Sequence, residues 1–194
     1  MLKSRQESEN QLKALQSRVD VLESVLQDQS ALIRQQQISL NQSEQYSRNL
    51  NLEIHGITAQ PNEDLRAFLA DFAKKIDIGF EPAQVQAVHR IPVAGDKIPP
   101  ILVRFVSVAV RNKWLAAARK RVRQLSFCGE VPTNTYVNEN LTALNRELLW
   151  KSKLRAKEQG YRFVWVKNGK VLVKKDEGQR VLFVASVGDL VKIV

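Results

Sequence analysis

Cysteine and histidine are scarce in this sequence. Its 194 residues include one cysteine, Cys128, and two histidines, His55 and His89, which lie far apart. A single thiol excludes an internal disulfide and a cysteine-rich zinc cluster, and the two histidines form no metal-binding motif. We therefore expect no metal and no other cofactor.

Long apolar runs are also missing. No run reaches the ~18 residues that a membrane-spanning helix needs, and no secretory leader opens the chain. The C-terminal stretch 181–194 is apolar, but Gly188 and Asp189 interrupt it. We therefore expect a soluble intracellular protein with no membrane partner, in the cytoplasm or, alternatively, in the nucleus.

The residue clusters that enzymes need are not evident. Glycine is sparse, with 8 residues in the chain, and none of them forms a phosphate-cradling loop. The acidic residues of segment 111–194 are scattered, whereas metal-dependent or nucleophilic catalysis requires carboxylates or a nucleophile and base close together. The sequence therefore predicts a protein that is not an enzyme and takes no small-molecule substrate.

Basic residues are what the sequence has in excess. There are 30 Lys and Arg against 20 Asp and Glu, a net charge of +10. Segment 1–47 has 5 basic and 6 acidic residues and segment 48–110 has 7 of each, whereas segment 111–194 has 18 basic and 7 acidic. A strongly basic segment predicts a polyanionic partner. An acidic membrane surface is the competing polyanion, but no lipidation motif or isolated amphipathic anchor accompanies the charge.

Residues 1–45 contain no glycine or proline and repeat apolar residues at alternating spacings of three and four. This pattern is typical of a left-handed coiled coil, and the alternative is an amphipathic helix folded back on its own domain. The later core positions, Gln29, Gln36 and Ser43, are polar, so the second half should be weaker. The pattern leaves the number of chains open, and we expect self-association through Leu12, Leu15, Val19, Leu22, Leu26, Ile33 and Leu40.

Residues 49–138 predict one domain with the element order β-α-β-β-α-β. Strands are expected at 50–57, 85–91, 101–108 and 135–138, and helices at 62–77 and 108–124, from the periods of their apolar residues. This order is the ferredoxin-like arrangement, whose commonest RNA-binding version is the RRM.

The exposed face of this predicted sheet is poor in aromatic rings. The outward positions of the first strand are Asn51, Glu53 and His55, and the third strand offers Arg104. An RRM stacks bases on aromatic side chains at such positions. We therefore expect an RRM-like fold that contacts the nucleic-acid backbone, with His55 as an ordinary exposed strand residue.

Residues 139–194 predict a small basic α+β domain made of a helix and a β-hairpin. The helix should begin after Thr142, a suitable N-cap, and end at Gly160. Asn168-Gly169 between alternating apolar residues predicts a hairpin with a type I′ turn. That turn would pair Trp165 with Leu172, Phe163 with Lys174 and Lys167 with Lys170.

Cations and aromatic rings are interleaved in this domain and in the helix before it. Surfaces of this composition bind single strands, because cations neutralise phosphates and rings stack on bases. The alternative is that the rings belong to the core and the cations form a solvated rim. The candidate nucleic-acid-binding residues are Arg104, Arg111, Lys113, Arg119, Lys120, Arg121, Arg123, Arg146, Trp150, Lys153, Lys157, Trp165, Lys167, Lys170 and Lys174.

The block from Val137 to Gly178 reads VNENLTALNRELLWKSKLRAKEQGYRFVWVKNGKVLVKKDEG. It resembles the C-terminal domain of the baculovirus few-polyhedra (FP) protein and of its transposon-derived insect relatives. The layout of a coiled coil, an RRM-like domain and a basic domain resembles the first open-reading-frame protein of LINE-type retrotransposons. The resemblance implies a homotrimer that binds single-stranded RNA and DNA and acts as a nucleic-acid chaperone in a transposon ribonucleoprotein. It also implies binding by basic stretches that include Arg104, Arg111, Arg119, Lys120, Arg146 and Lys153.

Together these patterns predict a non-enzymatic protein that binds single-stranded RNA or DNA with little sequence preference. A coiled coil would link several basic domains and so raise their avidity. The alternative is a coiled-coil scaffold whose basic domain binds an acidic protein, which retained oligomerisation without RNA affinity would identify.

Overall fold

The computed structural model describes residues 2–95, 97–127, 131–132 and 134–194. The chain forms two compact units, Met1–Gln42 and Ser43–Val194, and it is mixed α and β, as the sequence predicts. Cys128 lies outside the described residues. Within the described part, no helix combines the length and the apolar character needed to cross a membrane.

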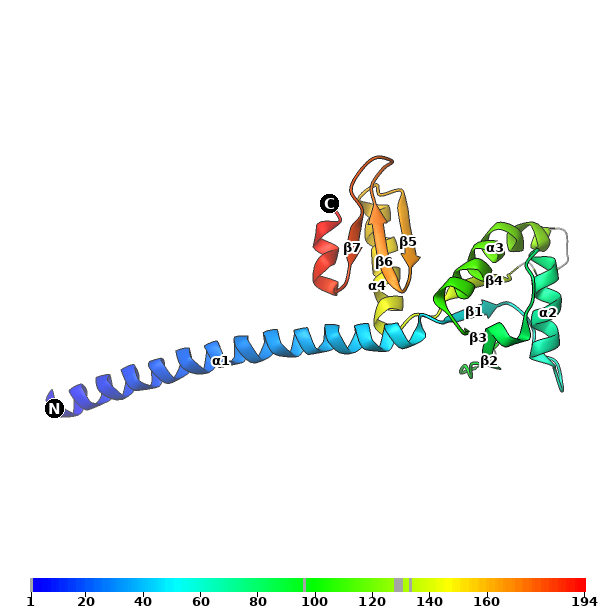
Figure 1. Ribbon diagram of the computed structural model, residues 1–194. Coiled ribbons are helices and arrows are strands. Elements are labelled where there is room, and N and C mark those ends of the chain that lie inside the picture. Colours follow the sequence, from blue (N-terminus) through cyan, green and yellow to red (C-terminus); the bar gives the residue numbers. More distant parts are fainter. Residues whose placement is uncertain (1, 96, 128–130, 133) are drawn as a thin grey trace. The chain divides into compact units, whose positions relative to one another are not determined.

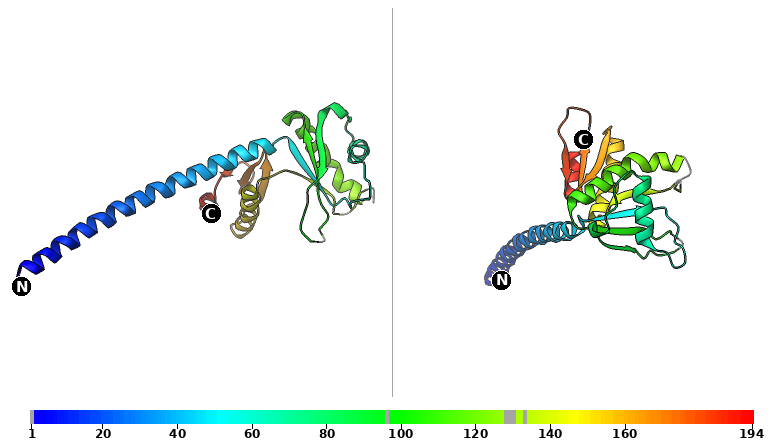
Figure 2. Two further views of the ribbon diagram at one scale, coloured as in Figure 1. Left: turned by 90° about the horizontal axis from the view of Figure 1, so that it is seen from below. Right: turned by 45° about the vertical axis from the view of Figure 1, so that its right-hand side comes forward.

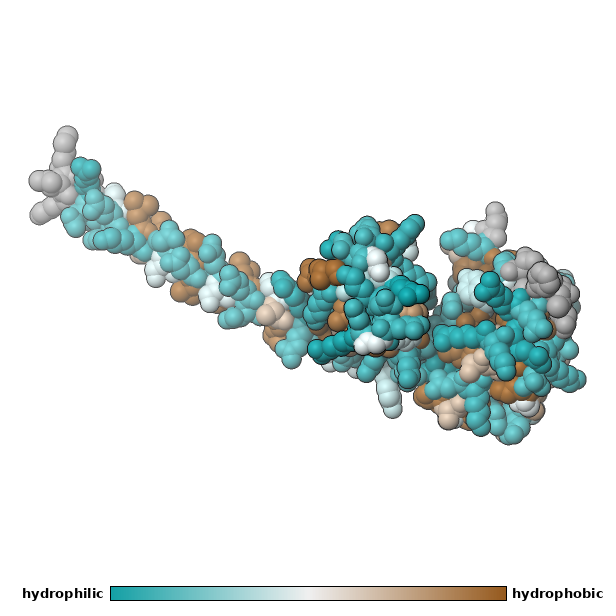
Figure 3. Space-filling model, turned by 90° about the horizontal axis from the view of Figure 1, so that it is seen from above, coloured by the Kyte–Doolittle hydropathy of each residue, from teal (hydrophilic) through white to brown (hydrophobic). Residues whose placement is uncertain are grey.

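Helix α1 (Leu2–Arg48) is one continuous helix of 47 residues, and this confirms the predicted helical segment. Figure 3 shows apolar side chains recurring along it among polar ones. The predicted seam residues have exposed fractions between the 45 % of Val19 and the 72 % of Leu40. An exposed apolar stripe is what a coiled coil buries on association, and the coiled coil itself stays a prediction.

The first sheet contains four antiparallel strands in the order β2-β3-β1-β4. A short 3-10 helix, η1 (Pro82–Gln84), precedes β2, and the order of the other elements is the predicted β-α-β-β-α-β. Along the chain (Figure 1) these elements are β1 (Asn51–His55), α2 (Leu65–Lys75), β2 (Val85–Arg90), β3 (Ile101–Phe105), α3 (Val108–Phe127) and β4 (Tyr136–Glu139).

Helix α2 is shorter than predicted because it begins after a side-chain cap. The Asp64 carboxylate accepts hydrogen bonds from the backbone N–H groups of Arg66 and Ala67, at 2.9 and 3.0 Å. This cap satisfies two of the unpaired donors of the first turn, so the helix starts at Leu65.

Helices α2 and α3 cover one face of the first sheet (Figure 2), and the larger core lies between them and the strands. Alternate strand residues point into this core, and the stripes of both helices meet them. Its most buried members include Leu52, Ile54, Leu69, Phe72, Ile101, Phe105, Trp114 and Ala118. The opposite face of the sheet therefore carries the outward side chains of the strands.

The C-terminal segment forms α4 (Ala143–Glu158), a three-stranded sheet of β5 (Phe163–Lys167), β6 (Lys170–Lys174) and β7 (Leu182–Val184), and η2 (Val187–Lys192). Thr142 caps α4 as predicted, and its hydroxyl accepts from Asn145 N at 3.1 Å. Asn168 and Gly169 have φ of +51° and +74°, which a type I′ turn requires. The predicted hairpin pairs are confirmed: Phe163 with Lys174, Trp165 with Leu172, and Lys167 with Lys170.

A buried polar cluster joins the last turn of α1 to the start of α4 and the hairpin turn. The Gln45 side chain is 6 % exposed and donates to the Asn140 carbonyl at 3.0 Å. Gln45 also accepts from Thr142 N and from Asn145 Nδ2, each at 3.0 Å. Asn145 Nδ2 donates in turn to the Gly169 carbonyl at 3.0 Å. These bonds tie the end of α1 to the start of α4 and to the hairpin turn.

Candidate nucleic-acid interface

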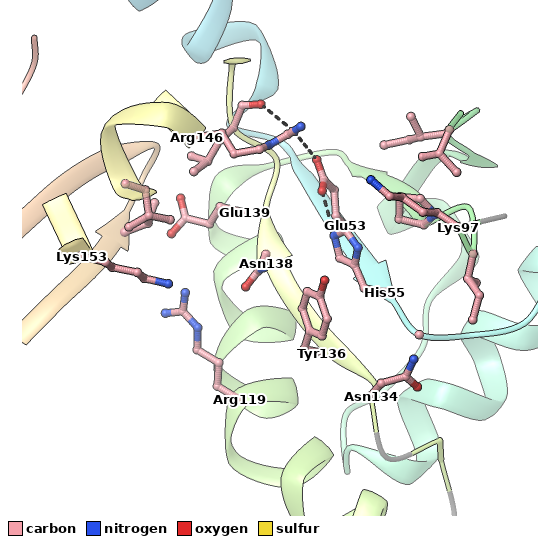
Figure 4. A pocket seen from close by; sticks show the side chains of 18 of the residues that line it. Glu53, His55, Lys97, Arg119, Asn134, Tyr136, Asn138, Glu139, Arg146 and Lys153 are labelled. Atoms are coloured by element: carbon pink, nitrogen blue, oxygen red, sulfur yellow. Dashed lines mark hydrogen bonds and ion pairs between the residues drawn. The ribbon is translucent and has the colours of Figure 1, made fainter. Parts of the chain in front are cut away.

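A cleft of about 910 Å³ lies between the outward face of the first sheet and the α4–β5 side of the second (Figure 4). Strands β1 and β4 form its floor, and α4 and β5 form one wall. The segment between β2 and β3 lines another wall, and α3 contributes one side chain. Elements that are far apart in the sequence therefore build this cleft together.

The floor of the cleft carries two stacked rings. Strands β1 and β4 pair so that His55 lies opposite Tyr136 and Glu53 lies opposite Asn138. The His55 and Tyr136 rings are nearly parallel, at 10°, with centroids 4.5 Å apart. Tyr136 is 49 % exposed, and His55 Nε2 lies 2.9 Å from Glu53 Oε2. The pair therefore presents an aromatic surface to the cleft.

The Glu53 carboxylate is buried beneath this surface and fully engaged. It accepts from Asn140 Nδ2, it interacts with His55, and its Oε1 lies 3.5 Å from Arg146 Nη2. Burial by itself raises the pKa of Glu53, but the hydrogen bonds from His55 and Asn140 and the charge of Arg146 outweigh it. The pKa of Glu53 is therefore lowered from its ordinary 4.5, and the group is ionised and paired at neutral pH.

Cationic side chains enter the cleft from several elements: Lys97, Arg119, Arg146 and Lys153. Figure 4 shows Arg119 of α3 and Lys153 of α4 pointing toward one another. Arg146 is engaged by Glu53, but Arg119 and Lys153 form no ion pair within the described part of the chain. Two cations that converge in this way repel each other and favour an anion between them.

Apolar groups line the rest of the cleft. Trp165 of β5 lines the cleft and is half-buried. The other apolar lining residues are Ile91, Pro92, Val93, Ile98, Pro100, Leu141, Leu149, Val164 and Val166. Rings and apolar surface therefore lie beside cations, which suits a ligand with charged and flat parts, such as an unpaired nucleotide.

The structure brings part of the predicted binding set together, because Arg119, Arg146, Lys153 and Trp165 all line the cleft. Some of the other candidates have partners: Arg104 Nε donates to Gln86 at 3.0 Å, and Arg121 lies 3.4 Å from Asp77. The candidates that lie outside the cleft lining are Arg104, Lys113, Lys120, Arg121, Arg123, Trp150, Lys157, Lys167, Lys170 and Lys174.

Arg111 corrects the sequence-based prediction, because this side chain is buried and not on a binding surface. It is 1 % exposed, and its Nη1 lies 3.3 Å from Glu139 Oε2. Its Nε donates to the Asn49 carbonyl at 2.9 Å, and its Nη2 donates to Asn168 Oδ1 at 3.1 Å. Burial lowers the pKa of Arg111, and the Glu139 carboxylate opposes that shift. Arg111 therefore joins the first sheet to the hairpin turn.

Sequence reasoning missed the His55–Tyr136 pair and Lys97. A signal for the pair was present, because the first and fourth strands of a β-α-β-β-α-β sheet are antiparallel neighbours. Rings on such strands can lie directly opposite each other. Lys97 follows β2 in an irregular segment, and no periodic pattern of the sequence identifies it.

The carboxylates of the cleft are paired with basic or amide groups. Glu139 accepts from Gly169 N at 2.7 Å and is paired with Arg111, and Glu53 is engaged as described above. In the part of the chain that the structure describes, no three His, Cys, Asp or Glu side chains are grouped so that they could hold a metal ion. The cations and rings of the cleft can neutralise charge and stack on flat groups.

The fold and the cleft define an α+β protein with a groove that is both basic and aromatic. Residues 142–194 match the family model described as Baculovirus FP protein domain 2. The match begins at the Thr142 cap and takes in α4, the second sheet and η2, so it confirms the predicted similarity to the baculovirus FP protein in this segment. A comparison with curated proteins gives no match. The similarity to LINE-type proteins rests on layout alone and stays a prediction.

Proposed function

We propose that this protein binds single-stranded RNA or DNA in the cleft, without catalysing a reaction and with little sequence preference. The cations of the cleft fit phosphates, and its rings fit unpaired bases. Every base has a flat face, so a surface that combines backbone charge with stacking accepts many sequences.

The observation that carries the proposal is the imbalance of charge in the cleft. Both lining carboxylates, Glu53 and Glu139, are held by neighbouring donors, whereas Arg119 and Lys153 converge without an ion pair among the described residues. A polyanion would relieve the repulsion between these cations and release counterions from its own phosphates. The net charge of +10 on the whole chain adds a long-range attraction for the same polyanion.

The fold agrees with this use of the cleft. Four antiparallel strands in the order β2-β3-β1-β4, with both helices on one face, support an RRM-like interpretation of the first sheet. In such domains single strands lie on the sheet face that the helices leave uncovered. That face is the floor of the cleft.

Self-association through α1 would make the binding multivalent. The exposed seam residues favour self-association, as the homotrimer that the resemblance implies or as a dimer, and linking several clefts would raise avidity without a new type of contact. The resemblance of the layout to LINE-type proteins favours a chaperone-like role in a transposon ribonucleoprotein, and the match of residues 142–194 adds a similarity to the baculovirus FP protein.

Fluorescence anisotropy tests this proposal with the full chain and a labelled single strand of about 30 nucleotides. Binding should weaken steeply as salt rises, and a duplex of the same length should bind less tightly. Arg119→Gln and Lys153→Gln should each reduce the slope of log K against log salt by about 0.7, the value for one phosphate contact on a single strand. Lys74→Gln, an exposed site on α2 outside the cleft lining, is the control of equal charge change.

The absence of binding at low salt would refute the proposal. If the protein still formed oligomers in sedimentation, the coiled-coil scaffold with an acidic protein partner would become the better explanation. Equal loss of slope in Lys74→Gln and Arg119→Gln would show that binding is spread over the surface and is not centred on the cleft.

A further inference from the structure

We propose that the His55–Tyr136 pair is a nucleobase-stacking platform, and that Arg119 and Lys153 hold the phosphate of the stacked nucleotide. The inference rests on the proposed function and goes further by assigning a base subsite and a phosphate subsite in the cleft. It also differs from the expectation that this sheet is poor in stacking surface and contacts only the nucleic-acid backbone.

The platform follows from the pairing of β1 with β4. These strands place His55 and Tyr136 directly opposite each other on the outward face, with the rings nearly parallel and their centroids 4.5 Å apart. The contact between His55 Nε2 and Glu53 fixes the imidazole, and Glu53 is itself held by Asn140. The Tyr136 ring therefore lies against a ring that is already oriented, and this reduces the entropy lost on binding a base.

Exposure separates this pair from a core contact. Buried rings fill the interior of a domain, whereas the Tyr136 side chain is 49 % exposed and lines the cleft. His55 covers one face of the Tyr136 ring, so the exposed part of the phenol is left for another flat group. An unpaired base is such a group, and its stacking on an aromatic side chain does not depend on base identity.

The phosphate subsite lies beside the platform. Figure 4 shows the guanidinium of Arg119 and the ammonium of Lys153 converging near Tyr136 and Asn138. Their elements, α3 and α4, approach from different sides of the cleft, and neither cation has an ion-pair partner among the described residues. A nucleotide whose base stacks on Tyr136 would have its phosphate within reach of this pair of cations.

This arrangement selects single strands. In a duplex each base face is covered by its neighbours, so a platform is useful only for an unpaired or unstacked base. The same cations would still attract duplex phosphates, which predicts weak binding of a duplex. The preference for a single strand over a duplex is therefore assigned to the ring pair, and the salt dependence is assigned to the cations.

A strand without bases separates the two subsites. The full chain is titrated with a labelled deoxythymidine 10-mer and with a 10-mer of abasic sites, both at low salt. The wild type should bind the thymidine strand on the order of tenfold more tightly than the abasic strand. Tyr136→Ala should lose most of that ratio and leave abasic affinity unchanged, whereas Tyr136→Phe should keep it. Arg119→Gln should weaken both strands equally.

Tyr46→Ala is the matched control, because Tyr46 is 81 % exposed and lies outside the cleft lining. An unchanged affinity for the abasic strand shows in the two Tyr136 variants and in Tyr46→Ala that the cleft is intact. Equal wild-type affinity for the two strands would overturn the platform and leave the proposed function standing. A ratio that falls as much in Tyr46→Ala as in Tyr136→Ala would overturn it too. Failure to bind either strand would overturn both proposals.

Discussion

Replacing Arg111 with methionine should destabilise the protein by about 3–5 kcal/mol, the range measured when one member of a buried ion pair is removed. Methionine fills much of the same volume, so packing changes little. The loss comes from the Glu139 carboxylate, which is 8 % exposed and would be left without the guanidinium at 3.3 Å. The hydrogen bonds from Arg111 to Asn49 and Asn168 would also be lost, which leaves two more polar groups without their donor.

Urea unfolding followed by tryptophan fluorescence, at one fixed protein concentration because the chain is expected to associate, measures this change. Lys113→Met is the control: Lys113 is exposed on the same helix, so its replacement should change the free energy of unfolding by less than about 0.5 kcal/mol. The double variant Arg111→Met with Glu139→Gln should recover most of the loss, since no charge then remains unpaired. A loss below about 1 kcal/mol in Arg111→Met would refute the reasoning, because losses of that size are typical of exposed ion pairs.

Three further outcomes are expected. Gly169→Ala should destabilise the protein more than Gly160→Ala in urea unfolding. Both glycines have positive φ, +74° and +70°, so both variants strain the backbone. Only at position 169 would the new Cβ also clash with a side chain, because Cδ of the buried, hydrogen-bonded Gln45 would lie 2.6 Å away. Leu26→Asp should shift sedimentation toward the monomer, whereas Ser24→Asp, on the polar side of the same helix, should not. Burial raises the pKa of Glu53, but its hydrogen bonds and the nearby cation lower it to below the ordinary 4.5. The stability that Glu53 contributes is therefore fully present above pH 4.5 and is lost as the pH falls through the lowered pKa. Glu53→Gln should flatten this acid-side fall of the melting temperature in thermal unfolding.

Each of these outcomes has a clear contrary result. Equal losses of unfolding free energy in the two glycine variants would mean that the close approach of Gly169 to Gln45, near the end of α1, adds nothing to the cost of the substitution. An unchanged oligomer in the Leu26 variant would exclude a seam at the predicted positions. An acid limb that persists in the Glu53 variant would assign the pH dependence to other carboxylates.

The sequence alone determined the features that depend on neighbours along the chain. Thr142 caps α4 because its hydroxyl needs only a backbone N–H three residues later, and Asn168-Gly169 form the turn because positive φ is a local requirement. The apolar periods gave the β-α-β-β-α-β order and the long helix for the same reason. These signals do not require knowledge of what packs against what.

The tertiary structure decided which of the many cations and rings act together. Arg111 is four residues before Leu115 and seven before Ala118, so it lies on the buried stripe of α3, but only the position of Glu139 on β4 makes burial of its charge favourable. The His55 and Tyr136 rings are 81 positions apart in the sequence, and the register of β1 against β4 brings them together. A site built across two sheets depends on long-range packing, and that information is not contained in any local pattern of residues.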